Sequence, residues 1–320
     1  MSKGWKIVLI VGVVIAVMYA ALLGLLFYFG DGGGRGGASW GSSGTVGVVR
    51  LDGVISADSQ ASLYGGGGID PVWAAETLRD ADADSSIDAV VLRVNSPGGS
   101  PAASWEIYQA VREMQKPVVV SVADVVASGA YYFSSAADSI VAAPSSEVGS
   151  IGVILTAQDL QGLFEKIGVG YTVITKGEYK DIGSPAREMT AQEKAILSAQ
   201  MEKIYQRFIA DVAEGRQNLD EKQVAALANG LTYPGEEALQ LGLIDKVGSY
   251  ADALDEAARL AQLDTGDYGV RYMEPESSGG ILPLLFGARA GDLARSLGNS
   301  LANGVREGLS GASSGGPRVE

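Results

Sequence analysis

The sequence contains no histidine and no cysteine. These absences exclude a Ser-His-Asp triad, a cysteine nucleophile, a zinc site built from His or Cys ligands, and a disulfide framework. A hydrolase of this composition has to combine a serine or threonine with lysine, or use carboxylates alone. For the same reason we predict no metal site.

Two further features exclude other classes of protein. The formal net charge is -14, and nucleic-acid binding requires a basic face, so we expect no nucleic-acid partner. The motif GxxxxGK[ST] is absent, which argues against an ATP-driven protease with a phosphate-binding loop of that type. There is also no basic patch for the phosphates of coenzyme A. We therefore predict that the protein needs no cofactor.

Residues 7–29 form an apolar run without a single charge. At about 1.5 Å per helical residue, this run can cross a hydrocarbon core of about 30 Å. Lys3 and Lys6 precede the run, so residues 1–6 should stay in the cytoplasm. The prediction is a single-pass anchor in the cell membrane, with the rest of the chain outside the cytoplasm. A cleaved signal peptide is the alternative, but its apolar region would be shorter and would precede a small-residue cleavage site.

The remaining sequence divides into three parts. Residues 30–45 are rich in Gly and Ser, which is typical of a flexible linker. Residues 46–262 carry the patterns of an ordered domain. Residues 263–320 form a looser tail, in which leucines spaced by multiples of four over 281–309 indicate an amphipathic helix.

Strand and helix signals alternate in the ordered domain. Residues 46–51, 89–94 and 117–122 are short apolar runs of the kind that form buried strands. Between the second and third runs, Ser100 and Pro101 are suited to begin a helix. This βαβ order favours an α/β fold with a parallel sheet. Further strands are predicted at 140–143, 151–155 and 171–174. Further helices are predicted near 220–228, 235–241 and 250.

A long helix is predicted after Thr190, which forms a capping box with Glu193. Its expected core face is an apolar stripe at helical spacing. The stripe consists of Leu197, Met201, Ile204, Phe208 and Val212.

Three glycine-rich segments lie beside predicted strands, at residues 95–99, 126–130 and 148–152. A serine hydroxyl needs a neighbouring base, and without histidine the natural base is a lysine whose pKa falls from about 10.4 toward about 7–8. Two backbone N–H donors must also stabilise the oxyanion, and glycine turns allow such donors to approach the substrate closely.

The order of the motifs resembles the signal peptide peptidase A family of Ser–Lys peptidases. The resemblance covers roughly residues 46–262, and it rests on NSPGG, ASGAYYFSSAAD, GSIGVI, KGEYKDIGSPAREMT and LTYPGEEALQLGLIDKVG. It implies a Clp/crotonase-like spiral of repeated β-β-α units following the transmembrane helix. It also implies ATP-independent cleavage of signal peptides and other hydrophobic peptides by a homo-oligomeric ring. In such a ring, the serine and lysine of one site can come from neighbouring protomers.

The resemblance assigns a role to each matching residue. Ser128 matches the nucleophile, Lys180 the general base, and Ser150 a hydroxyl that orients the lysine. Gly99 and Gly129 match the positions whose N–H groups form the oxyanion hole.

Some alternatives remain open at this point. Lys176 is a rival base four residues before Lys180, and the carboxylates of Glu178 and Asp181 flank Lys180. A carboxylate near the ammonium would raise its pKa, so we predict that both carboxylates point away from Ser128. Two other functions are compatible with the sequence. One is a membrane-bound Clp-class protease that cleaves integral membrane proteins, related to those paired with stomatin-like partners. The other is a catalytically silent oligomeric scaffold.

Overall fold

The computed structural model describes residues 44–57 and 68–273, which belong to one compact unit, Gly41–Pro275. The predicted anchor at 7–29 and most of the predicted linker and tail lie outside the described residues. Within the part of the chain that the structure describes, no helix is both long and apolar enough to cross a membrane.

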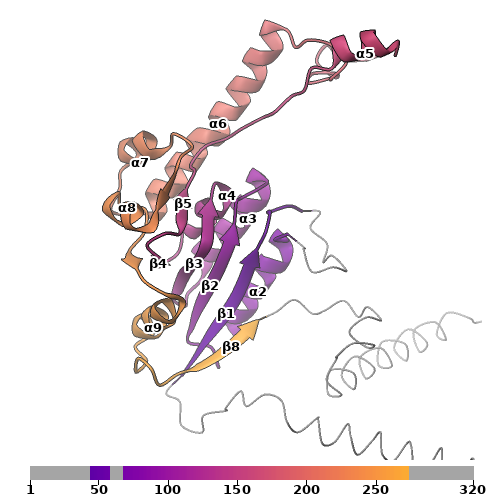
Figure 1. Cartoon of the computed structure of the whole chain (residues 1–320). Coiled ribbons are helices and arrows are strands. Elements are labelled where there is room, and N and C mark those ends of the chain that lie inside the picture. The colour runs from indigo at the N-terminus through magenta and orange to yellow at the C-terminus, as the bar shows by residue number, and fades with distance from the viewer. Residues whose placement is uncertain (1–43, 58–67, 274–320) are drawn as a thin grey trace, which may run out of the picture. The chain divides into compact units, whose positions relative to one another are not determined.

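A mostly parallel sheet forms the centre of the unit (Figure 1). Its main path runs β6-β5-β3-β2-β1-β8, and β4 joins β3 to β7 beside that path. All the described strand pairs are parallel except β5 with β6. The strands are β1 (Thr45–Asp52), β2 (Ala89–Ser96), β3 (Val118–Ala127), β4 (Ser139–Ala142), β5 (Glu147–Gly149), β6 (Thr232–Pro234), β7 (Lys246–Val247) and β8 (Gly269–Met273).

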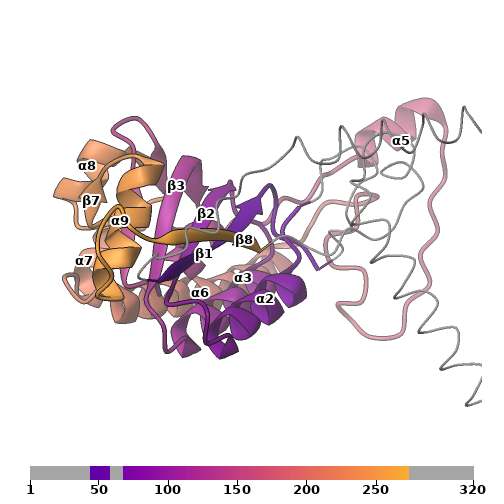
Figure 2. The ribbon, with the colours of Figure 1, turned by 90° about the horizontal axis from the view of Figure 1, so that it is seen from below.

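Helices cover both faces of the sheet, with α2 and α3 on one face and α9 on the other (Figure 2). The helices are α2 (Pro71–Ala83), α3 (Pro101–Glu113), α4 (Gly129–Ser134), α5 (Gln161–Ile167), α6 (Ala191–Gly215), α7 (Glu221–Leu227), α8 (Gly235–Gln240) and α9 (Tyr250–Leu260).

The apolar runs form strands because both of their faces are buried. Alternate side chains point to opposite faces of a strand, so Val90 and Leu92 of β2 face the larger core beneath α2 and α3. Ala89 and Val91 face the smaller core beneath α9. A strand buried on both faces reads as a continuous apolar run in the sequence, which is the pattern that predicted these strands.

Several predicted boundaries are confirmed. Ser100 caps α3, and Pro101 is the first residue of that helix. Thr190 and Glu193 form the reciprocal bonds of a capping box at the start of α6. The strand predictions at 46–51, 89–94, 117–122 and 140–143 correspond to β1, β2, β3 and β4, and the later helix predictions to α7, α8 and α9.

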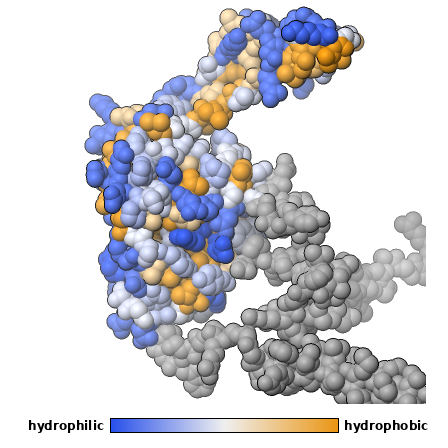
Figure 3. Space-filling view, viewed as in Figure 1, coloured by the Kyte–Doolittle hydropathy of each residue, from blue (hydrophilic) through white to orange (hydrophobic). Residues whose placement is uncertain are grey.

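The strand predictions at 151–155 and 171–174 are wrong. Residues 171–174 and most of 151–155 lie in residues 153–189, here called the arm, where no strand is present and no side chain is buried. Ile154 and Ile174 are each 91% exposed. Ile151 itself is buried, and its carbonyl oxygen accepts the N–H of Gly230 at 3.2 Å. An apolar run becomes a strand only when a neighbouring strand pairs with its backbone, and the described residues provide no such strand for residues 153–155 or 171–174. Figure 3 shows hydrophobic side chains on the surface of the arm around α5.

The predicted core face of α6 is confirmed only in its C-terminal half. Phe208 and Val212 are buried, but Ile204 is 41% exposed. The arm, rather than the body of the domain, lies along the N-terminal half of the helix, where arm residues including Leu155 and Met189 border a cavity of about 400 Å³ with Leu197 and Met201.

The folded domain also continues past the expected boundary at residue 262. Strand β8 pairs in parallel with β1, in a register that runs from Thr45↔Gly269 to Val49↔Met273. This edge strand is short and partly exposed, so its sequence lacks the continuous apolar pattern of the central strands.

Candidate active site

Ser128 lies at the junction between β3 and α4, in a conformation that serine rarely adopts. Its backbone has φ 53° and ψ -123°. Its N–H donates to the carbonyl oxygen of Gly149 at 2.8 Å. Ser128 occupies the N-cap position of α4, but its hydroxyl makes no capping hydrogen bond. A strained strand-to-helix turn with a free hydroxyl is the arrangement that presents a nucleophile to a substrate.

The turn that follows β2 packs directly against Ser128 and Gly129. A Cβ atom added to Gly98, which has φ +96°, would lie 2.7 Å from the backbone nitrogen of Gly129. A Cβ on Gly99 would lie 2.1 Å from the carbonyl oxygen of Ile55. Only glycine allows the two segments to approach this closely.

The backbone amides of Gly99 and Gly129 are close together and free. A Cβ on Gly129 would lie 3.3 Å from the backbone nitrogen of Gly99. Within residues 44–57 and 68–273, neither amide donates a hydrogen bond to another protein group. Two free N–H groups beside a serine hydroxyl are what an oxyanion hole requires.

Ser150 is held next to this centre through its own backbone. Its N–H donates to the carbonyl oxygen of Leu231 at 2.7 Å, and its hydroxyl donates to the carbonyl oxygen of Gly230 at 3.2 Å. The preceding residue, Gly149, accepts the N–H of Ser128. The structure therefore brings together four of the five predicted site residues: Ser128, Gly129, Gly99 and Ser150.

Lys180 is the predicted site residue that the single chain does not bring to Ser128. It lies in the turn over residues 178–183 of the arm, its side chain is exposed, and its N–H donates to the carbonyl oxygen of Gly177. The cavity beside Ser128 is bordered by neither Lys180 nor Lys176, and neither Glu178 nor Asp181 borders it. The lysine that does border it is Lys203 of α6.

Sequence reasoning missed Lys203. It precedes Ile204 of the predicted apolar stripe, and Arg207, four residues later, borders the same cavity. Its position next to the apolar stripe of a long helix was the available signal. The sequence did not indicate that this part of the stripe faces the cavity beside Ser128.

The cavity next to Ser128 has a volume of about 600 Å³ and largely apolar walls. The apolar side chains that border it include Trp105, Tyr132, Val153, Ile204 and Phe208. The ring of Tyr132 stacks on the ring of Tyr108, with 5.1 Å between their centroids. It is tilted relative to the ring of Phe208, with 4.8 Å between those two centroids. A cavity of this kind accepts an apolar side chain next to the bond that reacts.

Buried polar contacts fix the Tyr132 side of the cavity. The Tyr132 hydroxyl donates to the carboxylate of Asp211, which also accepts from Arg207 Nε at 2.7 Å. Burial, together with the bond to Asp211, raises the pKa of Tyr132, so this hydroxyl stays protonated at neutral pH. Tyr132 therefore lines the cavity as a fixed side chain and acts as neither an acid nor a base.

Arg187 lies between two carboxylates near Lys180. Its guanidinium binds both oxygens of Asp181, with Nε to Oδ2 at 2.8 Å and Nη2 to Oδ1 at 3.0 Å, and both oxygens of Glu193. These hydrogen bonds lower the pKa of Asp181, and with the backbone N–H of Thr190 they lower the pKa of Glu193 to about 2. The carboxylate beside Lys180 is therefore paired with an arginine in this chain.

Comparison with known proteins assigns the family. The model of peptidase family S49 matches residues 110–264. A candidate protease of Methanocaldococcus jannaschii is 41% identical over 245 residues, which cover 76% of this chain and 75% of that protein. This chain belongs to peptidase family S49, a family of serine proteases. Protease 4 of Haemophilus influenzae is 35% identical over 254 residues, which cover 77% of this chain but only 40% of that longer protein.

Other relatives agree with this S49 assignment. The chloroplastic serine protease SPPA of Arabidopsis thaliana is 30% identical over 221 residues, covering 68% of this chain and 32% of that protein. A solved structure named as a 1510-N membrane-bound stomatin-specific protease, in mutant form, matches with a TM-score of 0.50 at 17% identity. The match covers 73% of this chain and 99% of that chain, and it supports the fold alone.

Proposed function

We propose that this S49 peptidase is a membrane-anchored endopeptidase that degrades signal peptides and other hydrophobic peptides with a Ser128–Lys180 dyad. The observation that carries the proposal is the position of Ser128, whose hydroxyl makes no capping hydrogen bond and lies beside an apolar cavity and the amides of Gly99 and Gly129, which donate to no group among the described residues. Serine, oxyanion donors and a pocket for an apolar side chain are the parts that acyl transfer needs.

The proposed reaction is acyl transfer in two steps. Ser128 Oγ attacks the peptide carbonyl while the neutral amine of Lys180 takes the hydroxyl proton and then gives it to the leaving amine. The N–H groups of Gly99 and Gly129 stabilise the oxyanion. Lys180 next removes a proton from the water that attacks the acyl-enzyme, and it gives that proton to Ser128 Oγ as the acyl group leaves, which restores both residues. No step needs ATP.

We propose that Lys180 reaches Ser128 from a neighbouring protomer of a homo-oligomeric ring. In the single chain, Lys180 is exposed on an arm without buried side chains, and it does not border the Ser128 cavity. The arm carries exposed apolar side chains that a neighbour could cover. They are Ile154, Leu155, Leu163, Ile167, Val169, Tyr171, Val173 and Ile174. In this arrangement, the hydroxyl of Ser150 would orient the side chain of the incoming Lys180.

The finer architecture follows from the same proposal. The mostly parallel sheet with its βαβ connections is compatible with a Clp/crotonase-like spiral. Residues 7–29 would anchor the chain in the cell membrane, residues 30–45 would tether the domain on the outer side, and residues beyond β8 would form the tail. An anchored peptidase would meet hydrophobic peptides close to the bilayer that releases them.

Hydrolysis of a hydrophobic peptide by the full-length chain in detergent tests the function. We expect activity in the wild type, and loss of at least about 1,000-fold in Ser128→Ala and in Lys180→Ala, because both members of the dyad act as a unit. Lys176→Ala is the matched control that should keep the activity, and Lys203→Ala, on the wall of the cavity, should lose far less activity than Lys180→Ala. Full activity in Lys180→Ala together with loss in Lys203→Ala would move the base to α6 and contradict the assignment.

A further inference from the structure

Arg187 uses its whole guanidinium group to hold the segment that carries Lys180. Two of its hydrogen bonds go to Asp181, two go to Glu193, and Nη1 also donates to the carbonyl oxygen of Glu188 at 3.2 Å. These are five bonds from the five N–H donors that arginine has. A guanidinium bound in this way fixes the geometry of its partners more tightly than a lysine could.

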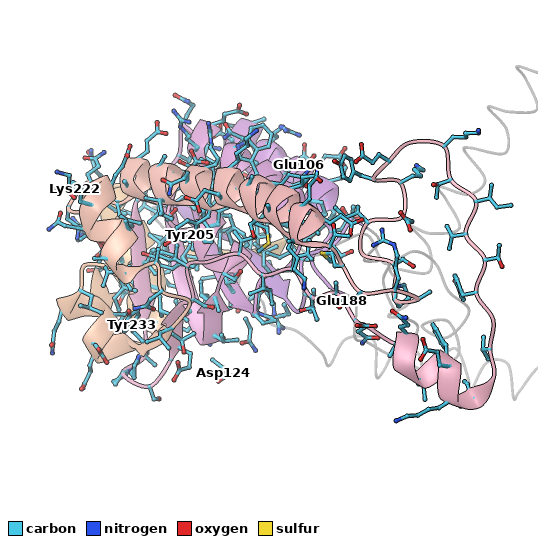
Figure 4. The ribbon with its side chains drawn as sticks, turned by 90° about the horizontal axis from the view of Figure 1, so that it is seen from above. Glu106, Asp124, Glu188, Tyr205, Lys222 and Tyr233 are labelled. Carbon is cyan, nitrogen blue, oxygen red and sulfur yellow. The ribbon has the colours of Figure 1, made fainter. Side chains whose placement is uncertain are left out.

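The two carboxylates belong to segments of different rigidity. Asp181 follows Lys180 in the turn of the arm, whose side chains are exposed or half-buried. Glu193 is 4% exposed and belongs to the capping box of α6, where the N–H of Thr190 donates to its Oε2 at 2.8 Å. Arg187 therefore ties the turn to the N-terminus of a long helix. Figure 4 marks Glu188 near the point where the chain enters α6.

A second contact joins the same two segments. Gln192 Nε2 donates to the hydroxyl of Tyr179 at 2.5 Å, on the other side of Lys180 from Asp181. Tyr179 is thus bonded directly to the first turn of α6, and Asp181 is linked to it through Arg187. The backbone of Lys180 is held while its side chain remains exposed.

Arg187 also binds the carboxylate of Asp181, which is the carboxylate closest to Lys180 in the sequence. A carboxylate that pairs with a lysine ammonium stabilises the charged form, which cannot accept a proton. Both oxygens of Asp181 are bound by Arg187, and these bonds lower the pKa of Asp181. The other charged groups near the turn in the sequence are Lys176, Glu178, Glu188 and Lys194, and Asp159 borders one cavity with Arg187, Glu188 and Lys194.

We propose that Arg187 is a positioning residue for the base: it fixes the Lys180 turn on the end of α6 and keeps the Asp181 carboxylate from pairing with the Lys180 ammonium. This inference rests on the proposed role of Lys180. It assigns to Arg187 no contact with the substrate. The effect of Arg187 passes through Lys180 alone.

The pH dependence of amine labelling at Lys180 tests the proposal without relying on activity. The full-length chain is labelled with trace acetic anhydride between pH 6 and 11, and the peptide that contains Lys180 is quantified by mass spectrometry. In Arg187→Gln, the freed Asp181 carboxylate should pair with the Lys180 ammonium and favour its charged form, so that labelling of Lys180 at a given pH falls about tenfold. Arg187→Lys should give a smaller shift in the same direction.

Removing the carboxylate should reverse the effect. In the double variant Asp181→Asn/Arg187→Gln, we expect the labelling profile of Lys180 to return toward that of the wild type. The acid limb of the pH–rate profile for peptide hydrolysis should move in parallel in every variant. Arg259→Gln is the matched control, because it also removes an exposed ion pair, with Glu256 at 2.6 Å, far along the sequence from the arm.

Two results would overturn the proposal. One is an unchanged Lys180 profile in both Arg187→Gln and Arg187→Lys, and the other is a double variant that keeps the shift of the single variant. If Arg187→Gln fails to fold, as judged by circular dichroism, Arg187→Lys and its double with Asp181→Asn decide the matter. Full activity in Lys180→Ala would instead contradict the proposed function, so the two failures are distinguishable.

Discussion

Ser128 donates its backbone N–H to the carbonyl oxygen of Gly149 at 2.8 Å, and both residues have positive φ angles, 53° and 111°. This bond joins the turn that presents the proposed nucleophile to the turn that carries Ser150. The strain at Ser128 is maintained by the surrounding packing, because α4 is entirely buried.

Relief of this strain should be measurable. Ser128→Gly should be more stable than Ser128→Ala by about 1 kcal/mol, because glycine adopts positive φ without a steric penalty. Both variants lack the hydroxyl, so neither should hydrolyse a peptide. Urea unfolding of the two variants measures the difference, and an Ala variant as stable as the Gly variant would show that the backbone of residue 128 is unstrained.

A methyl group at residue 129 should reduce kcat with little change in KM. In Gly129→Ala, the new Cβ would lie 2.2 Å from Ser104 Oγ and 3.3 Å from the backbone nitrogen of Gly99. Pairing it with Ser104→Gly removes the clash with the hydroxyl and leaves the methyl beside the proposed oxyanion donor. We expect kcat to fall by about 100-fold in the double variant, as for loss of one oxyanion-hole donor. Ser104→Gly alone is the control, and similar kcat values in the two would argue against this oxyanion hole.

Mixed assemblies test whether a site is shared between protomers. Ser128→Ala and Lys180→Ala should each be inactive alone. If Ser128 of one chain works with Lys180 of the next, co-assembly at equal amounts should restore about a quarter of the wild-type sites. Activity that stays absent after confirmed co-assembly would place both residues of a site in the same chain.

Acid should release the Lys180 turn from α6. The pKa of Glu193 is lowered to about 2 in the folded chain from an ordinary value of 4.5, chiefly by hydrogen bonds from Arg187. A lowered carboxyl pKa means stabilisation that is present above about pH 4.5 and is lost as the pH falls toward about 2. Hydrogen exchange of peptides spanning 177–193, corrected for intrinsic rates, should therefore lose protection over that range. Glu193→Gln should show the unprotected pattern at neutral pH, and protection that persists at pH 2 would contradict this account.

The sequence predicted the centre of the site better than its surroundings. The segments around Gly99, Ser128 and Ser150 are short glycine-containing turns beside strands, and strands of one parallel sheet bring such turns together. The capping box of Thr190 and Glu193 was also predictable, because it depends on residues three positions apart.

The arm could not be predicted in the same way. Residues 153–155 and 171–174 are as apolar as strands, but pairing depends on a neighbouring strand that the described residues do not offer. The pairing of Arg187 with Asp181 depends on how the turn folds back on α6. The spacing of these two residues in the sequence does not by itself predict an ion pair. Lys203 was missed because its importance depends on the cavity beside Ser128.

The most direct test of the central claim is to map the site of covalent modification by a fluorophosphonate in the assembled full-length protein. Mass spectrometry should find the adduct on Ser128 in the wild type and in Lys203→Ala, and it should find little or none in Lys180→Ala. An adduct on another serine, or undiminished modification of Ser128 in Lys180→Ala, would contradict the Ser128–Lys180 dyad.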